Sequence, residues 1–262
     1  MNSAHYVYAI VHRDSDLNAI ASSVGSELAM VPCRELAAVT RCVHQDGREP
    51  ATMKAVLQHE AVVESLRSRY PALPVRFGTL FRSADSIASS IEERYALLVA
   101  DLDRVGDKAE LSITALWAAP PCAGDAARHA DDAPAMHEGA RYLRARAFDL
   151  LRDEARKARA RAVAQEIDDT LGTFALERRA SFVPTPRIAV RAAYLLDPAN
   201  VGRFRAAFDV FREARIDMRL LLTGPWPPYG FVRHSEDEER RTDHRLGQFA
   251  RLLTEELQER CC

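Results

Sequence analysis

The chain has 262 residues, of which 47% are hydrophobic and 28% are charged. This composition is typical of a globular protein with a sizeable core, and it excludes disorder along the chain as a whole. The formal net charge of −2 gives no overall electrostatic reason to expect nucleic acid or an anionic membrane as a partner.

Cysteine usage and the first residues indicate a cytoplasmic protein. The five cysteines include no C-x-x-C pair, so they form neither a disulfide framework nor a zinc site, and a reducing compartment fits best. Residues 1–11 lack the basic start and cleavage site of a signal peptide and are typical of a first strand. No uncharged apolar segment approaches the ~18 residues of a membrane helix. Cys261 and Cys262 are expected to be inert thiols of an exposed tail.

The first part of the chain alternates between strand and helix patterns. The predicted elements are a strand at 5–12, a helix from about Leu17, strands at 27–31 and 35–42, a helix at 52–69 capped by Thr52, a helix opened by Ser83 or Asp85 and stopped by Gly106, and a strand at 110–118. This order is ferredoxin-like, with an extra helix before the last strand. We therefore predict a ferredoxin-like α+β domain at 1–118 and a linker at 119–137.

The remainder of the chain predicts a second, more weakly patterned α+β unit. Its expected elements are a long helix at 138–171, a strand at 187–196, a helix at 198–212, a strand at 216–222 and a helix at 236–260. The predicted fold class is therefore α+β with two domains. The N-terminal domain is a modified ferredoxin-like fold, and the C-terminal domain, 138–262, is an α+β unit with long helices.

The long helix carries the one basic patch of the sequence. Residues 141–161 hold eight basic residues and three acidic ones, a pattern that suggests nucleic-acid binding. A solvated helix face is the alternative, because Asp149 lies three positions before Arg152 and aromatic side chains that could stack on bases are few.

Residues 222–232, Leu-Thr-Gly-Pro-Trp-Pro-Pro-Tyr-Gly-Phe-Val, form the most unusual segment, which we call the Pro-aromatic ribbon. Its three prolines exclude a helix and make a central strand unfavourable, so a stiff extended conformation is expected. The ribbon has no catalytic side chain, so its role is contact. It either docks on the core of this protein or presents an aromatic surface to a partner. The contact residues are Pro225, Trp226, Tyr229 and Phe231.

A second special segment, at 73–81, reads Leu-Pro-Val-Arg-Phe-Gly-Thr-Leu-Phe. Arg76 lies in an apolar run and needs acceptors, either within the fold or on a partner, since an unpaired buried guanidinium is very costly. Gly78 allows a positive φ at a bend. With Phe77, these residues are candidates for partner binding or for a structural motif.

Catalytic patterns are weak throughout. The string His59-Glu60-Ala-Val-Val63 offers only one imidazole on its helix face, because Val63 occupies the position where a zinc helix needs a second histidine. His59 falls on the apolar side of its helix, which favours a hydrogen-bonded core or interface histidine. Nucleophile-elbow, P-loop and dinucleotide signatures are absent from the sequence. We therefore predict no enzyme, no cofactor and no metal site.

Together these segments resemble one known family, the gas vesicle protein L/F family of accessory assembly proteins. The resemblance is carried by Tyr6-Val-Tyr-Ala-Ile-Val at the start, Val31-Pro32 with Leu36-Ala-Ala-Val, and His59-Glu60. It continues through the segments beginning at Leu73 and Gly224, Leu-Pro-Val-Arg-Phe-Gly-Thr and Gly-Pro-Trp-Pro-Pro-Tyr-Gly-Phe-Val.

The resemblance implies a cytoplasmic, non-enzymatic protein with two α+β domains that supports the formation of gas vesicles, which provide buoyancy. Its implied partners are the small hydrophobic major shell protein and other gas vesicle accessory proteins, with no nucleic acid and no membrane. Two alternatives remain from the residues alone. One is an RNA-binding module that uses the basic helix at 141–161, and the other is a small-molecule enzyme on a ferredoxin-like fold with a pocket at His59, Arg76 or Trp117.

Overall fold

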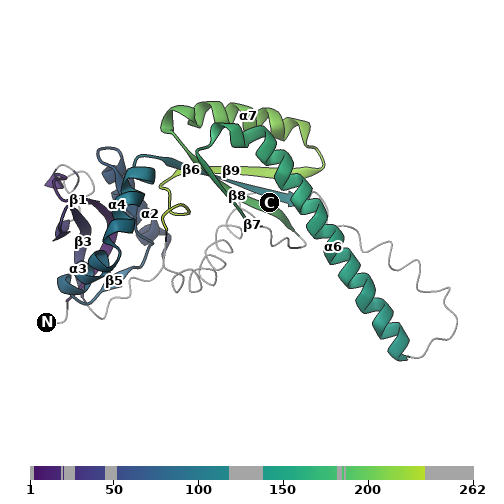
Figure 1. Cartoon of the computed structure of the whole chain (residues 1–262), viewed down its shortest axis with the longest axis horizontal. Helices are drawn as coiled ribbons and strands as arrows, with labels where there is room; N and C mark the ends of the chain where they lie inside the picture. The colour runs from purple at the N-terminus through teal and green to yellow at the C-terminus, as the bar shows by residue number, and fades with distance from the viewer. Residues whose placement is uncertain are drawn as a thin grey trace. The chain divides into compact units, whose positions relative to one another are not determined.

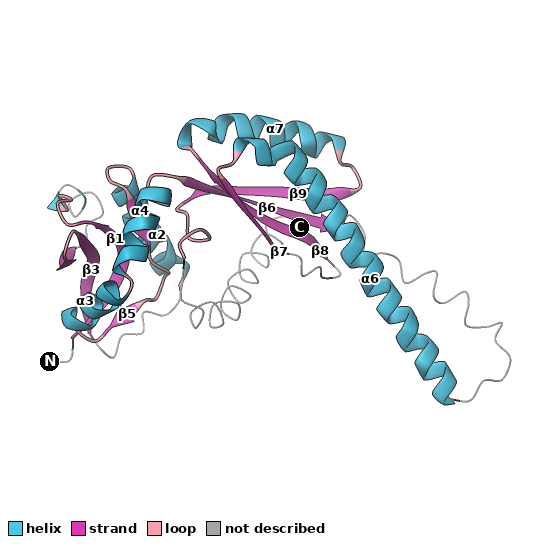
Figure 2. Ribbon diagram, in the orientation of Figure 1, coloured by secondary structure: helices cyan, strands magenta, loops and turns pink. Residues whose placement is uncertain are grey.

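The structure is a computed structural model that describes residues 3–18, 20, 27–44, 52–117, 138–181, 185 and 187–233. Both of its antiparallel sheets lie in one compact unit, Met1–Phe231 (Figures 1 and 2). The predicted α+β class is confirmed. None of the described helices is both long and apolar enough to cross a membrane.

The first sheet has the strand order β2-β3-β1-β4, and β5 also pairs with β1. Its strands are β1 Ser3–His12, β2 Ala29–Cys33, β3 Leu36–His44, β4 Ala72–Pro74 and β5 Leu80–Phe81. In β1 the register shifts between Val7 and Ala9, so Tyr6, Tyr8, Ala9 and Val11 belong to one core cluster. Tyr6 and Tyr8, two positions apart, share the face of β1 toward the helix that carries His59, and the bulge allows Ala9 and Val11 to join the same cluster.

Three described helices pack against this sheet: α2 Met53–Arg67 against β1 and β4, α3 Ala84–Glu93 against β2 and β5, and α4 Tyr95–Val105 against β4. Thr52 caps α2 as predicted, accepting a hydrogen bond of 3.2 Å from the Ala55 amide. Ser83 and Ser86 form a capping box at the start of α3. The single helix expected up to Gly106 is wrong, because the chain leaves helical geometry at Arg94 and begins again.

The second sheet has the order β7-β8-β6-β9. Its strands are β6 Ala109–Trp117, β7 Glu177–Ser181, β8 Ile188–Leu196 and β9 Met218–Trp226. Its helices are α6 Glu138–Leu171, followed by the short 3-10 turn η1 Gly172–Phe174, and α7 Val201–Ala214, preceded by the short 3-10 turn η2 Pro198–Asn200. The chain order β6-α6-β7-β8-α7-β9, with β6 and β8 in the centre, is the strand-helix-strand-strand-helix-strand unit of ferredoxin-like folds.

The prediction that the strand at 110–118 completes the first sheet is wrong. This strand is β6, which pairs with β8 and β9 in the second sheet. The fourth strand beside β1 is instead β4, which is too short and proline-containing to give a strand pattern in the sequence. The predicted linker at 119–137 and the predicted helix at 236–260, with Cys261 and Cys262, lie outside the described residues.

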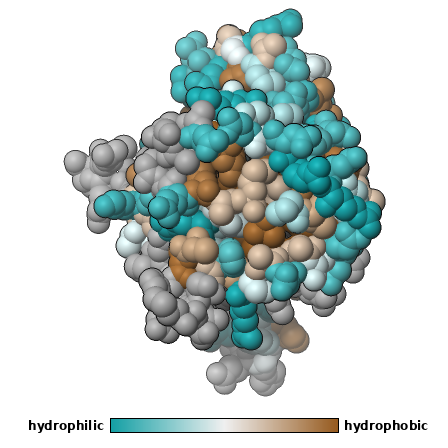
Figure 3. Space-filling view, turned by 90° about the vertical axis from the view of Figure 1, so that its left-hand side faces the viewer, coloured by the Kyte–Doolittle hydropathy of each residue, from teal (hydrophilic) through white to brown (hydrophobic). Residues whose placement is uncertain are grey.

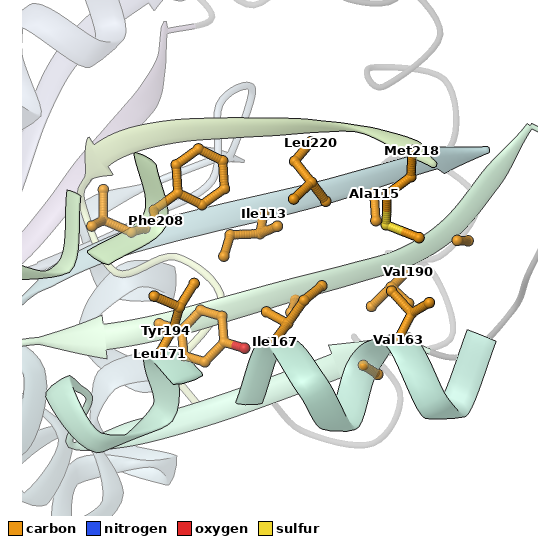
Figure 4. Close-up of a cluster of buried hydrophobic side chains, with 14 of the residues drawn as sticks. Ile113, Ala115, Val163, Ile167, Leu171, Val190, Tyr194, Phe208, Met218 and Leu220 are labelled. Carbon is orange, nitrogen blue, oxygen red and sulfur yellow. The ribbon is translucent and has the colours of Figure 1, made fainter. Parts of the chain in front are cut away.

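The core of the second sheet lies between the sheet and its two helices (Figure 4). Ile113, Tyr194 and Leu220 from three strands meet Ile167 of α6 and Phe208 of α7 there. The alternate residues of β6 are buried in this core, as the strand period of two requires. The buried part of α6 is therefore only its C-terminal third, which begins at about Ala160.

Candidate functional site

The Pro-aromatic ribbon is divided between anchored and exposed residues. Its first part, through Trp226, belongs to β9, which is longer than the predicted strand at 216–222. Pro225 and Trp226 are exposed, Tyr229 is partly buried and Phe231 is fully buried. The two alternatives from the sequence thus apply to different residues: the end of the ribbon docks on this protein's own core, and its beginning faces outward.

Tyr229 docks beside His59 of α2. The His59 side chain is 1% exposed, and its ring is stacked with those of Tyr8 and Tyr229, with centroid distances of 5.4 and 6.5 Å. The Phe77 ring meets it edge-on at 5.7 Å. The prediction that His59 is a hydrogen-bonded core histidine is confirmed.

The hydrogen bonds around His59 assign its protons. Nε2 lies 3.0 Å from the Val75 carbonyl oxygen, which can only accept, so Nε2 carries the proton. Nδ1 then accepts from the hydroxyl of Tyr6 at 2.9 Å, while that hydroxyl accepts from the Gly78 amide at 3.1 Å. His59 therefore joins β1 to the segment after β4 through hydrogen bonds, which gives it a structural role.

Tyr229 extends this network to a carboxylate. Its hydroxyl lies 3.1 Å from His59 Nε2 and donates to Oε1 of Glu60 at 2.9 Å. Burial raises the pKa of Glu60, although the hydrogen bond from Tyr229 opposes the shift. Burial, followed by the neighbouring Glu60 carboxylate, raises the pKa of Tyr229, so the tyrosine stays a neutral donor. The pair acts as a polar latch for the ribbon.

Phe231 is held by arginines from two elements. Arg104 of α4 donates to the Phe231 carbonyl oxygen at 2.7 Å and to Asp101, which is 0% exposed, at 2.8 Å. It also forms an ion pair with Glu177 of β7. The Arg179 guanidinium lies 5.5 Å from the Phe231 ring centre. Arg104 thus joins a helix of the first half, a strand of the second sheet and the ribbon.

Two further contacts fix the backbone of the ribbon. The Gly230 amide donates to Oε2 of Glu110 on β6 at 2.8 Å, and burial raises the pKa of Glu110 while this bond opposes the shift. Arg205 of α7 donates to the Gly224 carbonyl oxygen at 2.6 Å. Gly224 has a φ of +104°, and a Cβ there would lie 2.6 Å from the Glu110 carbonyl oxygen, so this position requires glycine.

The Arg76 segment forms the other wall of the network. Gly78 has a φ of +83°, which allows its amide to reach the Tyr6 hydroxyl. Phe77 lies against Tyr6 and His59. The Arg76 carbonyl oxygen accepts hydrogen bonds from the amide and the hydroxyl of Thr79. The side chain of Arg76 is half-buried. Of the predicted site residues, Phe77, Gly78 and Tyr229 therefore meet around His59, whereas Pro225 and Trp226 lie apart from them.

Sequence reasoning missed the residues that hold the ribbon, among them Glu60, which accepts from Tyr229, Arg104 and Glu110. Arg104 and Glu110 each stand on an element whose partner is far away in sequence, so no local pattern marks them. Glu110 alternates with Ser112 and Thr114 on the less buried face of β6, where a polar residue is expected, so no signal of its role was visible in the sequence.

Within the residues that the structure describes, the sites expected for the two alternative functions are not formed. Trp117 lies in the core of the second sheet and His59 beside that of the first, so they do not line one pocket. The shallow depression next to His59, lined among others by Tyr6, Tyr8 and Gln58, encloses no cavity of the size of a ligand pocket. The described residues contain no cluster of three or more metal-ligating side chains.

An RNA-binding sheet of this topology would present aromatics on its two central strands. On β6 and β8 the aromatics Trp117 and Tyr194 instead point into the helix-covered core. The opposite face is formed by small, polar or aliphatic residues: Glu110, Ser112, Thr114 and Leu116 on β6, with Arg191, Ala193 and Leu195 on β8.

Three comparisons with known proteins all identify the same family. The family model described as gas vesicle synthesis protein GvpL/GvpF matches residues 4–233. The chain is 28% identical to gas vesicle protein L of Streptomyces sp. (strain CB03234), over 90% of this chain and 96% of that protein. It is 23% identical to gas vesicle protein F2 of Halobacterium salinarum, over 88% and 94%. The crystal structure of GvpF from Anabaena sp. PCC7120 has the same fold, with a TM-score of 0.68 and 17% identity over 89% of this chain and 98% of that one.

Proposed function

Because this chain belongs to the GvpL/GvpF family of gas vesicle synthesis proteins, we propose that it is a non-enzymatic assembly factor that binds the hydrophobic major shell protein. Membership of the family gives the chain an accessory role in gas vesicles. The finer proposal is that it keeps the shell subunit from aggregating before polymerisation. It acts in the cytoplasm at the growing vesicle, together with other gas vesicle accessory proteins.

The observation that supports this proposal is that Trp226 is exposed although the segments on both sides of it are fixed. Its side chain is 47% exposed although both neighbouring segments are fixed, β9 by pairing with β6 and the ribbon by Tyr229 and Phe231. A tryptophan that is exposed but held in place loses little conformational entropy on binding, which is typical of an interface anchor. Pro225 beside it adds stiffness. We assign the partner-facing role to these two residues and the structural role to the other predicted site residues.

Strand addition is the mode of contact that we propose. Strand β9 is an edge of the second sheet, and in the described part of the chain no strand pairs with its outer side. An open edge can bind an extended segment through main-chain hydrogen bonds. Leu221, which is also exposed on β9, and Trp226 supply apolar side chains for a hydrophobic partner strand.

The surface of the first half is a second contact region for accessory proteins. Apolar residues gather near the centre of the face in Figure 3, with polar residues around them. Exposed apolar side chains of the first half include Met53 and Leu57 on α2 and Leu80 on β5. Apolar surface bordered by polar residues favours protein contacts.

The test is co-purification of the shell protein with the full-length chain. Wild type should retain the shell protein, and Trp226→Ala should lose at least tenfold of it while keeping an unchanged circular dichroism spectrum. Val210→Ala, which removes an exposed apolar side chain from α7, is the matched control and should bind as wild type does. Failure of the wild-type chain to retain the shell protein would contradict the proposal, and so would full retention by Trp226→Ala.

A further inference from the structure

The outer edge of strand β9 is available for pairing over most of its length. The strand lies at one side of the second sheet (Figure 1), and no strand in the described part of the chain pairs with its outer side. The edge ends at Gly224, whose carbonyl oxygen already accepts from Arg205 at 2.6 Å, and at Pro225, which has no N–H to donate. The available stretch is therefore residues 218–223, which we call the open edge.

The open edge lacks the features that usually protect an edge strand. Natural edges carry several charges, a proline or a bulge, or they lie under another element. Residues 218–223 read Met-Arg-Leu-Leu-Leu-Thr, so Arg219 is the only charged residue among them. The middle leucine, Leu221, is 37% exposed. A leucine-rich edge with a single charge is expected to be covered by a partner in solution.

The open edge is complementary to itself in one antiparallel register. Two copies of the chain can pair through β9 around a two-fold axis that is perpendicular to the sheet. With the axis at Leu221, that leucine lies opposite Leu221 of the second copy, and Leu220 lies opposite Leu222 of the second copy. Arg219 lies opposite Thr223 of the second copy. Each leucine thus faces a leucine, and no charge faces a like charge.

The neighbouring registers are less favourable. With the axis at Arg219, two guanidinium groups would lie directly opposite each other, which destabilises an antiparallel pair. With the axis at Leu220, Leu221 would face Arg219, and with the axis at Leu222 it would face Thr223. Both shifts replace leucine pairs by mixed pairs. The side chains of the open edge therefore select the register centred on Leu221.

Exposed apolar residues at the two ends of β9 fit the same register. Trp226 is 47% exposed, and Ile216, in the turn before the strand, is 94% exposed. In the pairing with β6, Thr223 lies opposite Ser112 and Trp226 lies opposite Glu110, two positions further along. The same spacing brings Trp226 to the turn of the second copy that holds Ile216. Contact between them would remove apolar surface from water at both ends of the paired strands.

We propose that β9 pairs with β9 of a second copy of this chain, so that the free protein forms a dimer. The open edge and Trp226 also carry the proposed contact with the shell protein. The dimer therefore protects this edge until the shell protein displaces the second copy. A short strand pair buries less surface than a stable dimer needs, so the association is expected to be weak and reversible. The competition rests on the proposed function, whereas the dimer itself does not.

Sedimentation velocity of the full-length chain tests the dimer. Wild type should change from monomer to dimer as its concentration rises. Leu221→Lys places two ammonium groups opposite each other at the axis, so it should weaken dimerisation at least tenfold. Val210→Lys adds the same charge at an exposed position of α7, and it should dimerise as wild type does. Circular dichroism checks that both variants are folded. A monomeric wild type, or equal dimerisation of the two variants, would overturn the proposal.

Disulfide cross-linking tests the register. A residue on the two-fold axis meets its own counterpart, so Leu221→Cys should link two chains through this position under mild oxidation. Mass spectrometry of the linked peptides distinguishes this bond from disulfides of the native cysteines. Thr223→Cys is the matched control, because position 223 lies opposite Arg219 rather than opposite itself. Equal self-linking of the two variants would overturn the register.

Added shell protein separates this inference from the proposed function. Size-exclusion chromatography with light scattering should show complexes that contain one copy of this chain. Complexes that keep two copies joined through β9 would overturn the competition. A chain that dimerises but does not bind the shell protein would contradict the proposed function and leave the dimer. A chain that binds the shell protein but never dimerises would overturn the inference alone.

Discussion

The hydroxyl of Tyr229 donates a hydrogen bond of 2.9 Å to the carboxylate of Glu60, 169 positions earlier in the chain. This bond joins the ribbon that follows the second sheet to the helix that covers the first. Because both partners are largely buried, the bond stabilises the fold only while donor and acceptor are both present. The ribbon is thus anchored at one end, which is the condition for a fixed Trp226 at the other.

Tyr229→Phe should destabilise the protein by about 1–3 kcal/mol, because the buried Glu60 carboxylate loses its donor while the ring remains. Urea unfolding measures the change in the free energy of unfolding. Tyr142→Phe removes an exposed hydroxyl from helix α6 and is the matched control, with an expected change within ~0.5 kcal/mol. Equal effects of the two substitutions would show that the latch contributes nothing.

Burial raises the pKa of Glu60 above its ordinary 4.5, so the folded state binds more protons than the unfolded state above pH 4.5. The stability contributed by this group is therefore present below pH 4.5 and is lost as the pH rises through the raised pKa. The Glu60→Gln variant has no carboxyl group here and so does not lose this stability as the pH rises. Its free energy of unfolding, compared with that of wild type, should therefore increase from pH 4 to pH 7. Urea unfolding at several pH values checks the slope.

Glu154→Gln is the control for this slope. The hydrogen bond from Lys157 lowers the pKa of Glu154, so its contribution is present above the ordinary pKa and is lost as the pH falls. The free energy of unfolding of Glu154→Gln, compared with that of wild type, should accordingly decrease slightly from pH 4 to pH 7. A Glu60→Gln curve parallel to that of wild type would contradict the role of burial.

Arg104→Met should destabilise the protein by about 3 kcal/mol, since it removes the ion-pair partner at 2.8 Å from the fully buried Asp101 and the donor to the Phe231 carbonyl. Arg212→Met breaks a pair of similar spacing with Asp209 at 3.0 Å, but on the exposed surface of α7. Its cost should stay below ~1 kcal/mol. Thermal unfolding of both variants distinguishes a buried clamp from a surface pair.

Gly78→Ala should cost about 1–2 kcal/mol, because only the positive φ is strained and the space around a new Cβ is open. Gly224→Ala should cost more, because the same strain is joined by a clash with the Glu110 backbone. The difference between the two free energies of unfolding isolates the contribution of the close approach between β9 and β6. A smaller cost at Gly224 would indicate that β6 and β9 move apart.

Phe231→Ala should destabilise by about 3–5 kcal/mol because the ring is fully buried. Trp226→Ala should cost much less, because nearly half of its side chain is exposed. Urea unfolding of the two variants, beside the co-purification test, separates the structural end of the ribbon from its contact end. Comparable destabilisation by both would mean that Trp226 is a packing residue.

Local sequence patterns were sufficient to predict many of the structural elements of this protein. The caps at Thr52 and Ser83, the helix at 138–171 and the burial of His59 follow from spacing and side-chain type, because a helix or a cap depends on neighbours within a few residues. The segments at 73–79 and 224–232 also marked the family, and the family model matches residues 4–233. Strands β4, β5 and β7 were not predicted, since each is short and β7 is largely charged.

By itself, then, the sequence determined the α+β class, the family and the stiffness of the Pro-aromatic ribbon. Only the tertiary structure decided which sheet receives β6, since an alternating apolar strand specifies a buried face but not the neighbour that pairs with it. It also decided which part of the ribbon docks on the core and which part faces outward. Whether an aromatic ring is an anchor or a contact depends on what lies against it, and the residues that hold Tyr229 and Phe231, Glu60 and Arg104, come from distant parts of the chain.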